Sequence, residues 1–265
     1  MNMTLFKREI KSNYKMLLIF LAIVTMYSTM IVAMFDPKLG ESLDMMAQSM
    51  PQLFSAFGMA KPATTLIGFI SSYLYGFILI VIPLIFIIIL CNKLIARYVD
   101  KGSMAYLIAT PNKRRNIVVT QAAVSMISIF CIVLYAALIC ITTGEIMFPG
   151  EMDILKFILI NIGLYGLLFF FGGVCFLSSC VFNDSRLSSG VGGGICVFFV
   201  LLQMISQVGD KFEFLKYITP LTLFQPDKLA LGEGSAIGMV SILYGTGLAL
   251  YIIGIGVFTK KDLSL

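Results

Sequence analysis

Long runs of apolar residues constrain this chain more than any other feature of its sequence. A helix needs about 20 residues to cross the hydrocarbon core of a bilayer, and several runs reach or exceed that length. Inside a bilayer every backbone N–H and C=O must be hydrogen-bonded internally, so only helices and closed barrels span it. The alternating pattern typical of barrel strands is absent. The sequence therefore predicts an all-α integral membrane protein.

The apolar runs predict a single transmembrane domain, residues 1–265, with six membrane-spanning helices. We expect the spans at residues 16–35, 66–90, 118–141, 154–181, 188–208 and 236–258. Residues 1–15 place apolar and basic side chains at helical spacing, which predicts an interfacial amphipathic helix. Residues 36–65 and 209–235 are rich in apolar side chains, and we expect short helices in these two outer segments.

The distribution of charge predicts the orientation of the chain. Only 12% of the residues are charged, and 59% are hydrophobic, whereas about a quarter of a soluble domain is charged. Most of the 19 Lys and Arg residues fall in the N-terminal segment, the loop 91–117, the turn 183–188 and the C-terminal tail. Basic loops stay in the cytoplasm. We therefore expect both termini to be cytoplasmic.

The loop 91–117 is the longest polar interruption between two apolar runs. It carries six basic residues: Lys93, Arg97, Lys101, Lys113, Arg114 and Arg115. Gly102 ends the preceding helix, and Ser103 is suited to cap a new one. Met104, Leu107 and Ile108 then fall on one helical face. From spacing alone, this short helix either lies on the membrane surface or docks in a groove of a soluble partner.

The sequence disfavours several kinds of chemistry. There is no His, which removes the usual general base and His-dependent metal sites. The six Cys residues lie in or at the ends of apolar runs without metal-ligand spacing. No phosphate-binding loop of the type GxxxxGK[ST] occurs, and no hydrolase motif is present. We expect neither an enzyme, nor a cofactor or metal held by this chain, nor a nucleic-acid partner.

The polar residues within the spans are almost all uncharged, and two interpretations remain open for them. They either make hydrogen bonds between helices or line a mildly polar path. The candidate path residues are Tyr27, Ser28, Phe69, Asn161, Tyr165 and Gln203.

The loop 91–117 resembles the first cytoplasmic loop of ABC-2-type transporter permeases. That family shows an acid before a Gly, a short helix that ends in Pro, an Arg, and an aliphatic pair that opens the third span. The matching residues are Asp100, Gly102, Ser103, Leu107, Ile108, Pro111, Arg114 or Arg115, Ile117 and Val118. The outer YITPLTLFQPDKL and the terminal FTKKDLSL are also similar to family segments. Asp100 departs from the Glu that is commoner in the family.

The resemblance implies a type V, ABC-2 exporter-like fold in the bacterial cytoplasmic membrane. Two copies of the chain, as a homodimer, would pair with two separate ATPase subunits that bind ATP and Mg²⁺. The loop helix would then be the coupling helix that docks in the ATPase. The coupling residues implied are Asp100, Gly102, Ser103, Met104, Tyr106, Leu107, Ile108 and Arg114. Secondary ATPase contacts are implied for Lys7, Arg8, Asp184 and Arg186.

In size and loop layout the chain is similar to permeases of small Gram-positive peptide exporters, such as the phenol-soluble modulin exporter. This resemblance implies amphipathic or hydrophobic peptides as substrates. Export of drugs, lipids or polysaccharides remains open, as does a membrane immunity protein that transports nothing.

Overall fold

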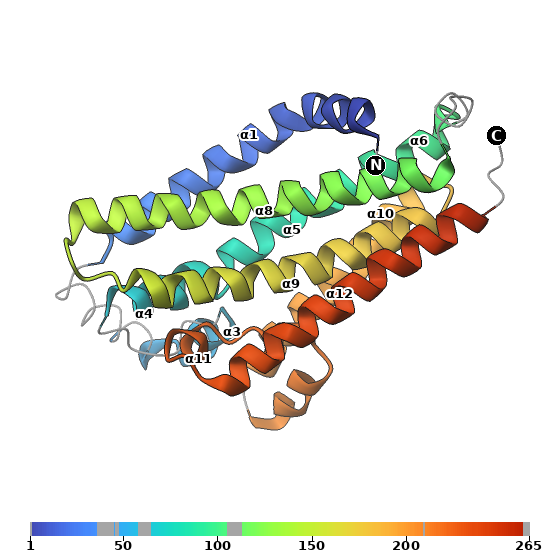
Figure 1. Ribbon diagram of the computed structural model, residues 1–265. Helices are drawn as coiled ribbons and strands as arrows, with labels where there is room; N and C mark the ends of the chain where they lie inside the picture. Colours follow the sequence, from blue (N-terminus) through green and yellow to red (C-terminus); the bar gives the residue numbers. More distant parts are fainter. Residues whose placement is uncertain are drawn as a thin grey trace.

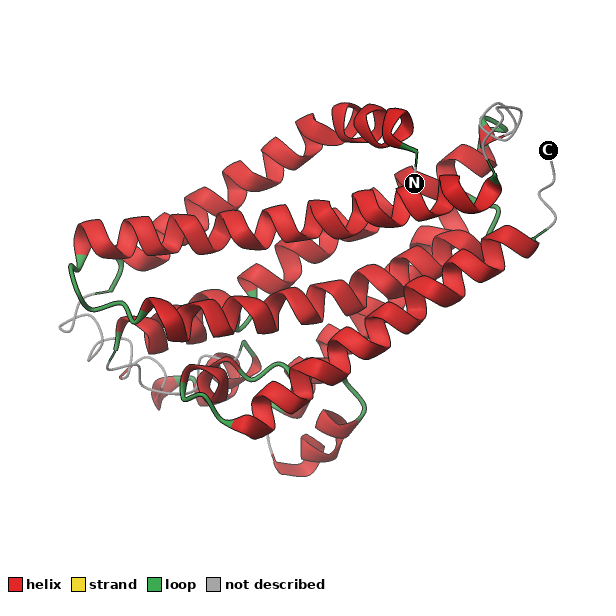
Figure 2. Ribbon diagram, in the orientation of Figure 1, coloured by secondary structure: helices red, strands yellow, loops and turns green. Residues whose placement is uncertain are grey.

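The computed structural model describes residues 2–35, 45, 48–57, 65–104, 113–208 and 210–261. All regular secondary structure in these ranges is helical (Figure 2). Six helices are long and apolar enough to cross a membrane, judged by length and composition. The prediction of an all-α protein with six spans is therefore confirmed.

The six spans lie side by side in an elongated bundle (Figure 1). They are α1 (Met3–Ala33), the composite segment Leu66–Asp100, α8 (Arg114–Met147), α9 (Ile154–Val181), α10 (Ser185–Ser206) and α12 (Gly234–Lys260). The composite segment contains α4 (Leu66–Ile70), the π-helix η1 (Ser71–Tyr75), α5 (Ile78–Cys91), the π-helix η2 (Asn92–Ala96) and α6 (Arg97–Asp100). Short helices of the outer segments are α3 (Pro51–Ala56), η3 (Asp210–Tyr217), η4 (Pro220–Leu223) and α11 (Pro226–Ala230).

The first helix is continuous, whereas the sequence suggested an interfacial helix before a separate span. Asn2 caps α1, because its side-chain oxygen accepts hydrogen bonds from the amides of Thr4 (3.0 Å) and Leu5 (3.2 Å). No Gly or Pro occurs within α1, so nothing in the sequence ends the helix between the amphipathic and the apolar part. Figure 1 shows instead that the helix changes direction after its first turns.

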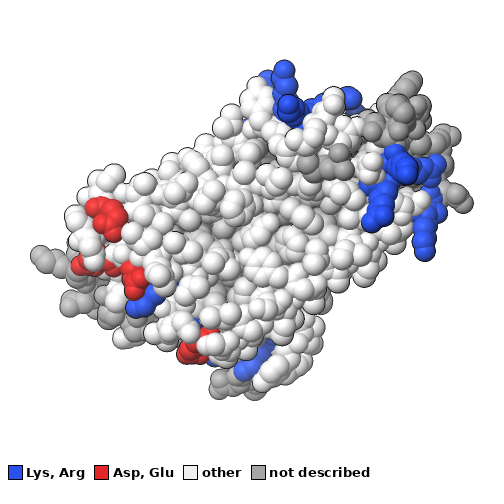
Figure 3. All heavy atoms as spheres, in the orientation of Figure 1, with Lys and Arg blue, Asp and Glu red and all other residues white. Residues whose placement is uncertain are grey.

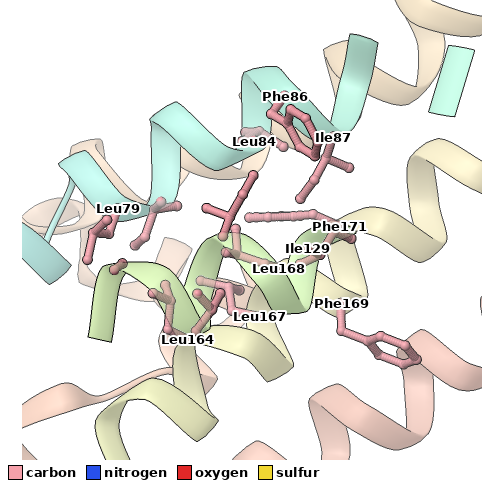
Figure 4. Packing of buried hydrophobic residues seen from close by; sticks show 14 of the residues in the cluster. Leu79, Leu84, Phe86, Ile87, Ile129, Leu164, Leu167, Leu168, Phe169 and Phe171 are labelled. Carbon is pink, nitrogen blue, oxygen red and sulfur yellow. The ribbon is translucent and has the colours of Figure 1, made fainter. Parts of the chain in front are cut away.

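Helix α9 is the centre of the bundle, since it packs against α12, α10, α8 and α5. Its buried face is built of Leu and Phe side chains that meet the aliphatic side chains of α5 (Figure 4). The residues labelled there are Leu79, Leu84, Phe86 and Ile87 of α5, Ile129 of α8, and Leu164, Leu167, Leu168, Phe169 and Phe171 of α9. Dispersion between these side chains fixes how the spans fit together.

Polar residues within the spans join pairs of helices. Thr25 of α1 shares a hydrogen bond of 2.8 Å with Tyr135 of α8. Ser125 of α8 shares one of 3.1 Å with Tyr251 of α12. For Thr25 and Ser125, the structure therefore agrees with the first of the two interpretations, hydrogen bonding between helices.

Glycines allow α9 and α12 to approach at backbone distance. A Cβ atom at Gly173 would lie 2.9 Å from the carbonyl oxygen of Gly247. A Cβ atom at Gly247 would lie 2.7 Å from the ring of Phe169 and 3.2 Å from the Cα atom of Phe170. Both positions are too tight for a methyl group, so small residues here permit the close contact between α9 and α12.

We predict that Gly247→Ala destabilises the protein in detergent, although Ala favours a helix by about 1 kcal/mol over Gly. Overpacking of this kind costs about 1–3 kcal/mol. The control is Gly245→Ala on the same helix, where an added Cβ meets nothing within 4 Å. Thermal unfolding followed by circular dichroism should show a lower midpoint for Gly247→Ala alone. Equal midpoints for the two variants would contradict the proposed close contact.

Candidate partner-binding site

Basic side chains gather at the end of the bundle where α1 begins and α12 ends (Figure 3). We call this the basic end. It comprises the start of α1, η2 with α6, the start of α10 and Lys261 after α12. On the face shown in Figure 3, the Asp and Glu side chains lie toward the opposite end, which we call the far end.

A hydrogen-bond junction joins α6 to the start of α10 at the basic end. Asp184 caps α10, because its Oδ1 accepts from the amide of Arg186 at 2.6 Å. Ser185 Oγ donates to Asp100 Oδ2 at 2.7 Å. Asn92 Nδ2 donates to the carbonyl of Ser185 (2.7 Å) and to Ser189 Oγ. The predicted coupling residue Asp100 and the predicted contact Asp184 are thereby brought together.

A second junction ties α1 to the same segment. Glu9 is 2% exposed, and its carboxylate accepts a hydrogen bond of 2.7 Å from the hydroxyl of Tyr98. Asn13, one turn later, donates from Nδ2 to the Glu9 carbonyl at 2.9 Å. Lys93 Nζ lies 3.5 Å from the carbonyl oxygen of Ser12, which accepts from it. A carboxylate so deeply buried needs such a partner, because an unpaired one is costly.

A recess of about 320 Å³ opens beside this second junction. It is lined by Glu9, Ser12, Lys93, Arg97, Tyr98, Lys101 and Ser103. Three cationic side chains thus surround one carboxylate that already accepts a hydrogen bond from Tyr98. The excess positive charge suits an acidic surface of a partner.

The C-terminal end of α12 is fastened to α9. Lys261 Nζ donates to the carbonyls of Cys180 (3.2 Å) and Val181 (2.5 Å), which are among the last of α9. Burial lowers the pKa of Lys261 below its usual value. Arg114 donates to the Lys261 carbonyl at 3.4 Å. Arg114, predicted as a coupling residue, therefore contacts the chain's own C-terminal part.

The remaining predicted coupling residues lie at different depths. Gly102 has a φ of 66° and follows α6, so it ends that helix in the left-handed conformation that Gly adopts readily. Met104 is 1% exposed and belongs to the hydrophobic core, and its role in coupling stays a prediction. Ser103 is half-buried. Tyr106, Leu107 and Ile108 lie outside the described residues.

The predicted secondary contacts Lys7, Arg8, Asp184 and Arg186 are all exposed at the basic end. Sequence reasoning missed Glu9, Asn13 and Tyr98. A signal for Glu9 and Asn13 was available, because both follow Leu5 at four-residue steps and so share its buried face. The basic residues Lys7, Arg8, Lys11 and Lys15 are exposed.

The candidate path residues do not lie together at one place in the structure. Asn161 accepts a hydrogen bond of 2.8 Å from Tyr75, and Gln203 lies near Tyr75 in the wall of one recess at the far end. Tyr165 makes an edge-to-face ring contact with Phe130 of α8 and a tilted ring contact with Tyr244 of α12. Tyr27 and Ser28 are on α1, half-buried and buried respectively. Phe69 is buried and packs on Phe35 at the end of α1.

The sequence matches the model of one protein family, described as "ABC-2 family transporter protein", over residues 3–263. Among curated proteins, none matches the sequence. The family match covers nearly the whole chain, including the six spans described above and both hydrogen-bond junctions of the basic end. Membership implies a membrane permease that works with an ATPase carried by a partner. This chain is a member of the ABC-2 family of transporter proteins.

Proposed function

We propose that this chain is the membrane-spanning subunit of an ATP-driven exporter in a bacterial cytoplasmic membrane. Its basic end lies in the cytoplasm and binds a separate ATPase subunit, which holds ATP and Mg²⁺. Two copies of the chain and two ATPase subunits form one exporter. The exported molecules are amphipathic or hydrophobic peptides. The chain itself supplies the path and no catalytic group.

The two junctions at the basic end carry this proposal. The segment that leads into the predicted coupling helix is bonded to α10 through Asp100 and Asn92, and to α1 through Tyr98. A movement of the loop therefore acts directly on the second span, and through these hydrogen bonds it also acts on α10 and α1. This is what a permease needs if ATP binding on a partner is to move its helices.

The distribution of charge supports the orientation. Basic residues next to spans remain on the cytoplasmic side of a membrane. The N-terminal part of α1, the segment that leads into loop 105–112 and the α9–α10 turn lie at one end of the bundle (Figure 1). This arrangement supports the proposal that one soluble partner contacts all three.

An apolar groove supports a hydrophobic or amphipathic substrate. The groove lies between α9, α10 and α12 and measures about 580 Å³. Its walls include Phe170, Leu177, Ile195, Phe199 and Leu250. Such a surface binds apolar side chains or acyl chains without unpaired polar groups. Lipid export is therefore the second candidate, because the same groove suits an acyl chain.

We predict that the chain, purified in mild detergent from cells that express its neighbouring genes, brings an ATPase with it. An amphipathic helical peptide should stimulate ATP turnover by this complex, and Leu107→Asp in the predicted coupling helix should abolish the stimulation. An ATPase that responds to phospholipid and not to peptide would replace the peptide assignment with lipid export. Absence of any ATPase would favour a membrane immunity protein.

We predict that Tyr98→Phe weakens both the fold and the coupling. The change leaves the buried Glu9 carboxylate without the hydroxyl that donates to it, and such a loss costs about 1–3 kcal/mol. The unfolding midpoint in detergent should fall, and peptide should stimulate ATP turnover less.

The matched control for this prediction is Tyr14→Phe, since Tyr14 is 45% exposed on the same helix as Glu9. Its midpoint and its peptide response should equal those of the wild type. If Tyr98→Phe behaves like Tyr14→Phe in both measurements, the junction between α1 and α6 has no part in stability or coupling.

A further inference from the structure

A polar recess of about 460 Å³ lies at the far end of the bundle, away from the basic end. It is formed by η1, the start of α5, the end of α10 and the outer segment from η3 to α11. Its wall includes the polar residues Ser71, Ser72, Tyr75, Gln203, Gln207 and Thr222, together with the charged residues Lys216, Asp227 and Lys228. In a chain that is 59% hydrophobic, a wall so rich in hydroxyl and amide groups is unusual.

The backbone around this recess departs from a regular α-helix. Ser71, Ser72 and Tyr75 belong to the π-helix η1, and single π-helical turns occur frequently at functional sites. The outer helix α3 ends against this segment, because a Cβ atom at Gly76 would lie only 2.9 Å from the carbonyl oxygen of Phe57. Gly76 thus lets the outer segment approach the wall of the recess.

One hydroxyl in the wall has no partner among the described residues. Ser71 is 2% exposed, and its Oγ accepts and donates no hydrogen bond there. Native proteins pair nearly all buried polar atoms with protein, water or ligand. An unpaired buried hydroxyl in the wall of a recess therefore indicates a group that enters from outside the chain.

The neighbouring polar groups are held in place by the fold. Tyr75 donates to Asn161 at 2.8 Å, and Thr222 Oγ1 lies 2.5 Å from the carbonyl oxygen of Lys216 and 3.2 Å from Gln203 Oε1. The Gln203 side chain carries both N–H donors and a carbonyl acceptor. The recess therefore offers hydroxyl and amide groups in fixed positions, which suit the polar side chains of a ligand.

The recess and the apolar groove adjoin the same stretch of α10. Phe199 lies in the wall of the groove, and Gln203 lies in the wall of the recess. Residues four apart are neighbours on one face of a helix. The lining of α10 thus changes from apolar to polar within one turn, which matches a molecule that carries both kinds of surface.

We infer that the far-end recess binds the polar face of an amphipathic peptide through Ser71 and Gln203, while the peptide's apolar face uses the groove. The inference rests on the proposed function, because it takes peptides as the exported molecules. The recess adds a polar part to the peptide-binding site that the groove forms. It lies at the end of the bundle where an exported peptide leaves the membrane. Polar contacts there hold the peptide's polar side chains as they leave the hydrocarbon.

The test is direct binding to the full chain in lipid nanodiscs. The probe is a helical peptide with Ser and Gln on its polar face and one Trp on its apolar face. The chain contains no Trp, so the emission reports the peptide alone, and empty nanodiscs give the blank. The variant is Ser71→Ala, with Ser241→Ala as the control, because Ser241 is exposed on α12.

Ser71→Ala should weaken binding about three- to ten-fold, the effect of one lost hydrogen bond, while Ser241→Ala binds as the wild type does. Without peptide, Ser71→Ala should unfold at the same or a higher temperature, because the change removes an unpaired hydroxyl. Unchanged affinity for Ser71→Ala would overturn the recess as a binding site and leave the exporter intact. A wild type that binds the peptide no better than empty nanodiscs would overturn both the recess and the peptide assignment.

Discussion

The need to satisfy every backbone polar group within hydrocarbon determines most of this structure. It makes each span a helix, and it directs most of the hydrogen-bonding side chains in the spans toward neighbouring helices or their own backbone. Helix α9 lies at the centre of the bundle and packs against four other spans. Gly173 and Gly247 let α12 approach α9 closely, and the ring of Phe169, which lies against Gly247, also packs with the ring of Tyr251.

The second span departs from regular helix at two places, and each departure lies beside a candidate site. The π-helix η2 places Asn92 against α10 at the basic end, and η1 places Ser71 and Tyr75 in the wall of the far-end recess. Widened turns of this kind expose backbone and re-aim side chains. One span therefore runs between the predicted ATPase-binding end and the proposed peptide-binding recess, which is the arrangement that coupling across the membrane requires.

The number of spans and the basic end followed from the sequence, because both depend on local composition. Long apolar runs give helices, and the basic residues of the loop 91–117 cluster regardless of how the helices pack. The pairing of Glu9 with Tyr98 did not follow from the sequence, because the two residues are 89 positions apart. The spacing of Met104 gave the helical face on which it lies, but its burial depends on what covers that face, which spacing does not give. The pairing of Asn161 with Tyr75 likewise depends on tertiary contact.

The central claim is that the basic end binds an ATPase, and site-directed photo-crosslinking tests it most directly. Five of the six native Cys residues are buried, so an introduced exposed Cys is labelled selectively once the half-buried Cys131 is replaced by Ser. A benzophenone maleimide attached at Arg186→Cys should cross-link to the co-expressed ATPase, whereas the same reagent at Ser235→Cys, at the far end, should not. Cross-linking at neither position, in a complex that still co-purifies, or at Ser235→Cys alone, would contradict the account.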